Sequence, residues 1–145
     1  MSRSGTGLAD SEDMTLRKFF RTLEGRAVLR HHANLLLVSS ARLRERVAAV
    51  LTRYLPGPVH CLTRWPVESP PREGTVIIPA IEQFSLDDQR RMLSWFEHRE
   101  RVLQVIAVTA VPLLNRVLKG DFIDDLYYRM NTLYVPLDAI CAPAL

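Results

Sequence analysis

Hydrophobic positions along the chain alternate between short continuous runs and stripes with helical spacing. The runs have the length of buried strands and cover residues 34–38, 59–62, 76–78, 102–108 and 132–136. Stripes that recur every three to four positions predict helices over residues 15–31, 40–54, 85–96, 112–120 and 122–130. Alternating strands and helices predict an α/β three-layer sandwich, with a mostly parallel sheet covered by helices on both faces.

Residues at the ends of the predicted helices support these boundaries. Ser85 and Asp88 have the spacing of a capping box. Gly120 is placed to end the short helix that Pro112 begins. In the helix that Ser85 opens, we expect an inward-facing apolar stripe made of Leu86, Met92, Leu93 and Phe96.

The chain has 145 residues, 48% of them hydrophobic and 24% charged, which suits one globular domain. We expect a flexible leader over residues 1–13 and a single domain over residues 14–145. The sequence holds no run long enough to span a bilayer and no signal-peptide pattern, so a cytoplasmic location is expected. Cys61 and Cys141 are far apart in sequence and are expected to be buried free thiols rather than a disulfide or zinc ligands.

Positive charge is concentrated in residues 15–55, where nine basic and two acidic residues give +7, against +3 for the whole chain. Arg42, Arg46 and Arg53 in this region are candidate interaction residues. The region is interpreted as a solvated helix face, with contact to an acidic partner or to nucleic acid as alternatives. The sequence contains no helix-turn-helix or zinc-finger pattern that would favour base readout.

Other chemistry finds little support in the sequence. His31 and His32 are adjacent and point to different sides of a helix, so they are expected to be surface residues rather than a metal pair. Trp65 and Trp95 are expected to anchor packing. The chain lacks a nucleophile elbow or a spaced triad, so no metal, cofactor or catalytic residue is predicted.

Three spaced segments carry a family resemblance: GTVIIPAIEQFSLDDQRRMLSWFEHR, VLQVIAVTA and LLNRVLKGDFIDDLYYRMNTLYVPL. In this order they resemble the Walker B strand, the following helix, the first sensor strand and the "G.FR.DLYyRLn" segment of bacterial sigma-54 activators. The resemblance covers residues 74–137 and more loosely residues 34–54. It implies the P-loop NTPase fold of the central AAA+ domain of that family.

Residues that would bind the phosphates in that family have no counterpart here. The stretch VSSARLRERVAAVL stands where the resemblance places the phosphate loop, and it contains neither glycine nor lysine. Arg44 falls near the expected lysine position. It is therefore a candidate for a vestigial anion contact, with an exposed helix arginine as the alternative.

The acidic and sensor positions are also replaced. Pro79 and Ala80 stand where the family has the Walker B acids, which organise magnesium and activate water. Glu82 follows two positions later, but we expect the strand to have ended before it and do not expect it to substitute for them. Ala110 takes the polar sensor position.

Of the two arginines that the family directs at a neighbouring subunit, the first is Ile123 here and the second is Arg129. Arg129 is interpreted as a structural arginine that pairs with Asp124, Asp125 or a helix C-terminus. The alternative is action in trans on an intact ATPase partner.

Two further features of the family are not found. The interval CLTRWPVESPPRE between the second and third predicted strands contains no GAFTGA motif, so direct sigma-54 contact is not expected. No helical lid is expected after the last predicted strand.

The sequence thus predicts a domain similar to sigma-54 activators that does not hydrolyse ATP and acts by protein–protein interaction. Its partner would be an AAA+ activator or a second copy of the chain. One alternative is nucleotide or anion binding without hydrolysis through Arg44 and Arg129, and another is nucleic-acid binding through residues 15–55.

Overall fold

A five-stranded sheet forms the centre of the computed structural model, which describes residues 17–18, 20–22, 25–26, 30–42, 44–55, 57–98 and 104–136. All its strands are parallel, and their order is β2-β3-β4-β1-β5. The strands are β1 (Leu35–Val38), β2 (Val59–Cys61), β3 (Thr75–Ile78), β4 (Gln104–Thr109) and β5 (Leu133–Pro136). Each lies within a predicted strand or within one residue of it, so the five strand predictions are confirmed.

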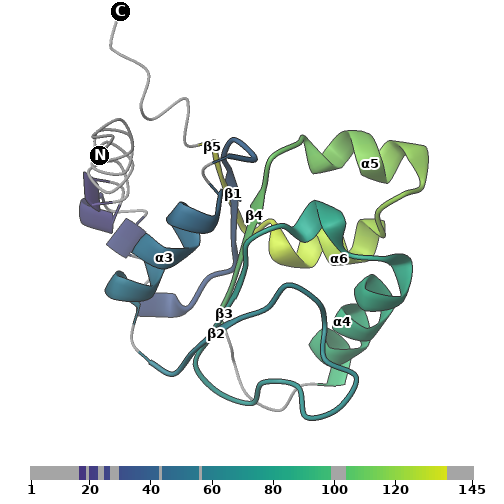
Figure 1. The fold of residues 1–145 in the computed structure, drawn as a ribbon, viewed down its shortest axis with the longest axis horizontal. Coiled ribbons are helices and arrows are strands. Elements are labelled where there is room, and N and C mark those ends of the chain that lie inside the picture. Colours follow the sequence, from purple (N-terminus) through teal and green to yellow (C-terminus); the bar gives the residue numbers. More distant parts are fainter. Residues whose placement is uncertain are drawn as a thin grey trace, which may run out of the picture.

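Helices cover both faces of the sheet, as Figure 1 shows. α3 (Arg44–Tyr54) lies on one face, and α4 (Leu86–His98), α5 (Leu113–Lys119) and α6 (Asp124–Met130) lie on the other. β3 and β4 are buried along their whole length, because a parallel sheet covered on both sides has no solvated face. The predicted three-layer α/β sandwich is confirmed.

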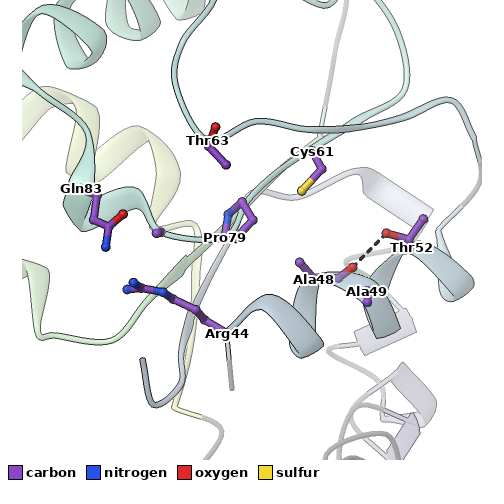
Figure 2. Close-up of a pocket in the computed structure, with 9 residues that line it drawn as sticks. Arg44, Ala48, Ala49, Thr52, Cys61, Thr63, Pro79 and Gln83 are labelled. Atoms are coloured by element: carbon purple, nitrogen blue, oxygen red, sulfur yellow. Dashed lines mark hydrogen bonds between the residues drawn. The ribbon is translucent and has the colours of Figure 1, made fainter. Parts of the chain in front are cut away.

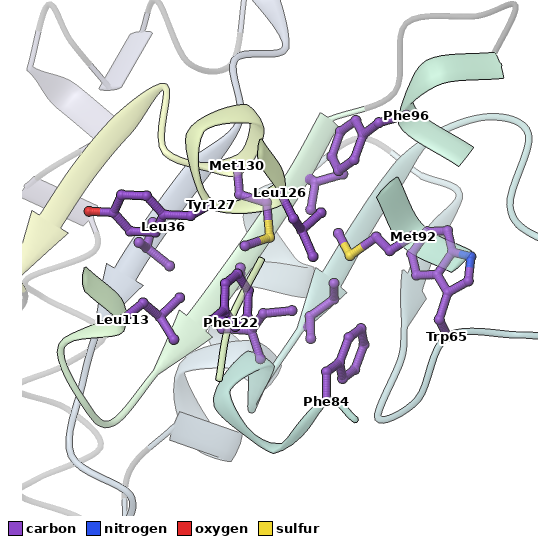
Figure 3. Packing of buried hydrophobic residues seen from close by; sticks show 14 of the residues in the cluster. Leu36, Trp65, Phe84, Met92, Phe96, Leu113, Phe122, Leu126, Tyr127 and Met130 are labelled. Atoms are coloured by element: carbon purple, nitrogen blue, oxygen red, sulfur yellow. The ribbon is translucent and has the colours of Figure 1, made fainter. Parts of the chain in front are cut away.

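Each face of the sheet has its own hydrophobic core. Leu35 and Leu37 of β1 point toward α3, whereas Leu36 points to the opposite core. In the second core, side chains of β1, β3 and β4 pack against side chains of α4, α5, α6 and the loops beside them (Figure 3). The side-chain alternation of a strand therefore assigns successive leucines of β1 to different layers.

Asp88 joins the start of α4 to the loop that precedes β3. Its carboxylate accepts hydrogen bonds from the Ser85 hydroxyl (3.0 Å), the backbone N–H of Trp65 (3.2 Å) and Arg91 (2.6 Å). The Asp88 N–H donates to the Ser85 hydroxyl oxygen at 3.1 Å, which confirms the predicted capping box. Burial acts to raise the pKa of Asp88, but these hydrogen bonds outweigh it and lower the pKa below its usual value.

Glycine is required at two turns. Gly120 has φ +83° and caps the C-terminus of α5, as predicted. Gly74 has φ +91°, and a Cβ there would lie 1.9 Å from the carbonyl oxygen of Pro58. That carbonyl accepts the N–H of Thr75 at 3.0 Å, so this close approach sets the start of β3 beside β2.

Two expectations about burial were wrong. Leu86 is 42% exposed, because it is the first residue of α4 and lies outside the stripe formed by Met92 and Phe96. Cys61 was expected to be a buried thiol, but it is exposed, because β2 is a short strand at one edge of the sheet. The predictions for Cys141 and for the leader fall outside the described residues, as do eight of the 17 positions of the predicted helix over residues 15–31.

No helix in the part of the chain that the structure describes is long and apolar enough to cross a membrane.

We expect Asp88→Asn to lower the free energy of unfolding by about 2 kcal/mol, because it removes a buried charge that accepts several hydrogen bonds. The pKa of Asp88 is lower in the folded state than its usual 3.8. The stabilisation is therefore complete above pH about 5 and is lost as the pH falls through the folded-state pKa. Urea denaturation between pH 3 and 7 measures both effects.

Asp87→Asn is the matched control, because the neighbouring Asp87 carboxylate is 76% exposed and, within the described part of the chain, forms its ion pair with the exposed Arg90. We expect it to change the free energy of unfolding by about 0.5 kcal/mol or less. Equal effects of the two substitutions would contradict the role given to Asp88.

Candidate functional site

The carboxyl ends of β1, β3 and β4 lie side by side in the sheet. Ligands of open parallel sheets bind outside these ends, so the residues that follow the strands form the candidate site. Ser39 and Ser40 follow β1 and lead to α3, which begins at Arg44. Pro79 and Ala80 follow β3, and Ala110 follows β4.

An ion pair between Arg44 and Glu82 occupies this edge of the sheet. Both side chains are mostly buried, with 16% of Arg44 and 6% of Glu82 exposed. The Arg44 guanidinium donates from Nη1 to Oε1 of Glu82. The other carboxylate oxygen accepts the backbone N–H of Ala110 at 3.1 Å, so both oxygens of Glu82 are engaged.

Glu82 reaches this position because the chain turns immediately after β3. The strand ends at Ile78, as expected, and residues Ile81–Gln83 form the single-turn helix η2. Ile81 and Phe84 are buried on either side of Glu82 and hold the turn against the second core. Sequence reasoning placed Glu82 beyond the strand correctly but missed that this turn directs its carboxylate to Arg44.

Neither residue at the Walker B-like positions can bind a metal through its side chain. Pro79 and Ala80 carry no polar side-chain atom, and no group of three or more His, Cys, Asp or Glu residues suited to a metal occurs among the described residues. Ala110, at the sensor-like position, has no polar side-chain atom either, and the hydroxyl of the preceding Thr109 donates to the backbone carbonyl of Val111 at 2.8 Å.

A pocket of about 340 Å³ lies beside the ion pair, between α3 and the ends of β2 and β3. Figure 2 shows Arg44 at one end of it, Pro79 at its centre and Ala48 and Cys61 on the far side. Of the described residues that line it, Arg44 is the one that carries a charge, and that charge is already paired with Glu82. The described lining of the pocket therefore offers no unpaired cation to a phosphate group.

The structure does not bring the two predicted arginines together. The backbone carbonyl of Arg129, in the last turn of α6, accepts a hydrogen bond from Asn34 at 2.8 Å, just before β1 begins. Arg44 follows the opposite end of β1, so within one chain the two residues cannot hold the same nucleotide. Arg129 is exposed and, among the described residues, makes no ion pair with Asp124 or Asp125. It lies in the last turn of α6, which agrees with the remaining option of a structural arginine at a helix C-terminus.

The three candidate interaction residues are all at the surface. Arg42 lies in the turn before α3, and Arg46 and Arg53 lie on the helix; each is exposed. Exposure agrees with a basic face on the outer side of α3. His31 and His32 are exposed too, as expected.

The connection between β2 and β3 is packed against α4. Trp65 is buried, and its ring lies 5.0 Å from that of Trp95 in an edge-to-face arrangement. The Trp95 indole donates to the carbonyl of Pro71 at 3.1 Å. Both tryptophans therefore anchor packing, as predicted, and they hold this connection against the domain.

Solved structures of one protein, NtrX from Brucella abortus, resemble the chain over most of its length. Its ADP complex has a TM-score of 0.58 and 15% identity, and matches 91% of this chain. Its ATP complex has a TM-score of 0.57, 17% identity and 92% coverage, and a third structure has a TM-score of 0.56, 17% identity and 91% coverage. The chain has an AAA+-like α/β fold.

The chain spans 42%, 36% and 41% of the length of those NtrX chains. Similarity at this level of identity concerns the fold, which agrees with the strand order and the helix layers described above. No protein-family model and no curated protein sequence matches the chain.

Proposed function

We propose that the chain is a non-hydrolysing domain, similar to those of sigma-54 activators, that acts by protein–protein interaction in bacterial transcription regulation or signalling. The observation that carries this proposal is the engagement of both Glu82 oxygens by Arg44 and the Ala110 amide. A buried internal ion pair at the carboxyl ends of the strands competes with a bound phosphate for the same arginine.

Loss of hydrolysis follows from the chemistry that ATP cleavage requires. Magnesium must be held by oxygen ligands, and a polar group must orient the attacking water. Pro79 and Ala80 supply neither, and the carboxylate of Glu82 is committed to its own hydrogen bonds. Two of the NtrX structures are complexes with ADP and with ATP, so a protein that contains this fold binds nucleotide.

A protein partner is supported by the charge on the outer side of α3. Arg42, Arg46 and Arg53 are exposed there, while Asp124 and Asp125 are exposed at the start of α6. These opposite charges suit contact with an acidic surface on an AAA+ activator or on a second copy of the chain. Direct contact with sigma-54 is not part of this proposal, because the β2–β3 connection is packed by Trp65 and Trp95. The proposed location is the cytoplasm.

We expect the wild-type chain to show no ATP hydrolysis above the blank. We also expect no saturable binding of ATP or ADP in the presence of magnesium at nucleotide concentrations up to about 1 mM, which would detect a dissociation constant in the millimolar range or below. The reason is that Arg44 is already paired with Glu82. Titration calorimetry and a phosphate-release assay measure the two quantities. Micromolar binding that Arg44→Ala abolishes would replace this proposal with nucleotide binding without hydrolysis.

The basic face formed by Arg42, Arg46 and Arg53 is tested by reversing its charge. We expect the triple substitution of Arg42, Arg46 and Arg53 by glutamate to weaken self-association, or association with an intact AAA+ activator from the same cell, by at least about tenfold. Sedimentation velocity measures it. Arg90→Glu on α4 is the control, because Arg90 is exposed on the opposite layer.

Undiminished association of the triple variant would contradict the assignment of this face. Wild-type protein that associates with neither partner would contradict the proposed function. Fluorescence anisotropy with DNA and RNA at about 50 mM salt tests the nucleic-acid alternative, for which binding should fall steeply as salt is added; we expect no binding.

A further inference from the structure

Donor groups from separate parts of the fold converge on Glu82. The Arg44 guanidinium comes from the first residue of α3, and the Ala110 N–H comes from the end of β4. A third element contributes as well, because Arg116 of α5 donates to the backbone carbonyl of Glu82 at 3.4 Å. Proteins bind carboxylate and phosphate groups with cationic side chains and backbone N–H groups. Glu82 has one donor of each kind, the Arg44 guanidinium and the Ala110 N–H.

We infer that Arg44 and the Ala110 amide form a binding site for a single oxyanion group, and that Glu82 is its built-in occupant. The carboxylate fills the site from within the chain, so the wild-type protein does not take up a free anion there. Removal of this one side chain opens the site to small carboxylates and to inorganic phosphate.

The attachment of Glu82 explains why it excludes a free anion. Ile81 and Phe84 are buried on either side of it, and the N–H of Phe84 donates to the carbonyl of Ile81 at 3.1 Å. The backbone therefore presents the carboxylate at a fixed place, and its binding requires no loss of translational freedom. A tethered group of this kind has an effective concentration in the millimolar range or above. A free anion that binds weakly would need a higher concentration than this to displace it.

Chemical rescue tests the inference. Glu82→Ala leaves the Arg44 charge and the Ala110 amide without an acceptor, so we expect the melting temperature to fall by about 4 °C or more. Formate or inorganic phosphate at about ten times its dissociation constant should restore about 4 °C at constant ionic strength. Wild-type protein and Glu97→Ala, which removes an exposed carboxylate on α4, should show no such gain.

The double variant Arg44→Ala/Glu82→Ala identifies the site, because it lacks the cation that would hold the anion. We expect formate and phosphate to have no effect on it. Equal stabilisation of the double variant, or of the wild type, would overturn the inference, since the anions would then act elsewhere. Absence of rescue in folded Glu82→Ala would overturn it as well.

A second pair of variants keeps the test decisive if Glu82→Ala does not fold. Arg44→Met and Glu82→Gln preserve side-chain volume, and each leaves one partner of the pair without its counter-charge. We expect the double variant Arg44→Met/Glu82→Gln to melt at a higher temperature than either single variant. Single variants that both melt above the double variant would contradict the inference. Binding of ATP to the wild type would contradict the proposed function, whereas formate or phosphate would still be expected to restore the stability of Glu82→Ala.

Discussion

The carboxylate of Glu82 is shared between the Arg44 guanidinium and the Ala110 amide. This contact occupies the edge of the sheet where the carboxyl ends of its strands lie. The carboxyl ends of β1, β3 and β4 lie side by side there. The Ala110 N–H and the N-terminus of α3 at this edge favour a negatively charged hydrogen-bond acceptor. Here the chain supplies that acceptor itself. The ion pair and the Ala110 hydrogen bond consequently join the ends of β3 and β4 to the start of α3.

Polar residues inside the second core position the elements around this contact. Gln89 of α4 donates to the carbonyl of Phe84 at 3.1 Å and accepts the N–H of Ile123 at 2.9 Å. It thereby ties the turn that carries Glu82 to the connection between α5 and α6. Asp88, one residue earlier, holds the β2–β3 connection through the N–H of Trp65. Adjacent residues at the start of α4 therefore fix the segments on either side of the site.

The sequence predicted the elements with the strongest local signals. Strands β3 and β4 are buried on both faces, so they read as continuous apolar runs such as Val76–Ile78. The start of α4 and the end of α5 follow from Ser85 and Gly120, whose chemistry is local. The AAA+-like strand order agrees with the family resemblance of residues 74–137.

The contact between Arg44 and Glu82 could not be read from the sequence. The two residues are 38 positions apart, and Glu82 lies in a three-residue turn that is too short to have a periodic pattern. The exposure of Cys61 was missed for a related reason, since the sequence does not show which strand lies at the sheet edge. Arg129 and Arg44 lie at opposite ends of β1, and the sequence does not show this placement either.

The backbone amide resonance of Ala110, followed by NMR while magnesium–ATP is added to the wild-type chain, reports whether Glu82 keeps its place beside Arg44. Glu82 already accepts the Ala110 N–H, so we expect the chemical shift of this amide to stay constant as ATP is raised to about 5 mM, which detects millimolar and tighter binding. A saturating shift of the Ala110 amide would show that nucleotide displaces the carboxylate, and the site would then not be closed by Glu82.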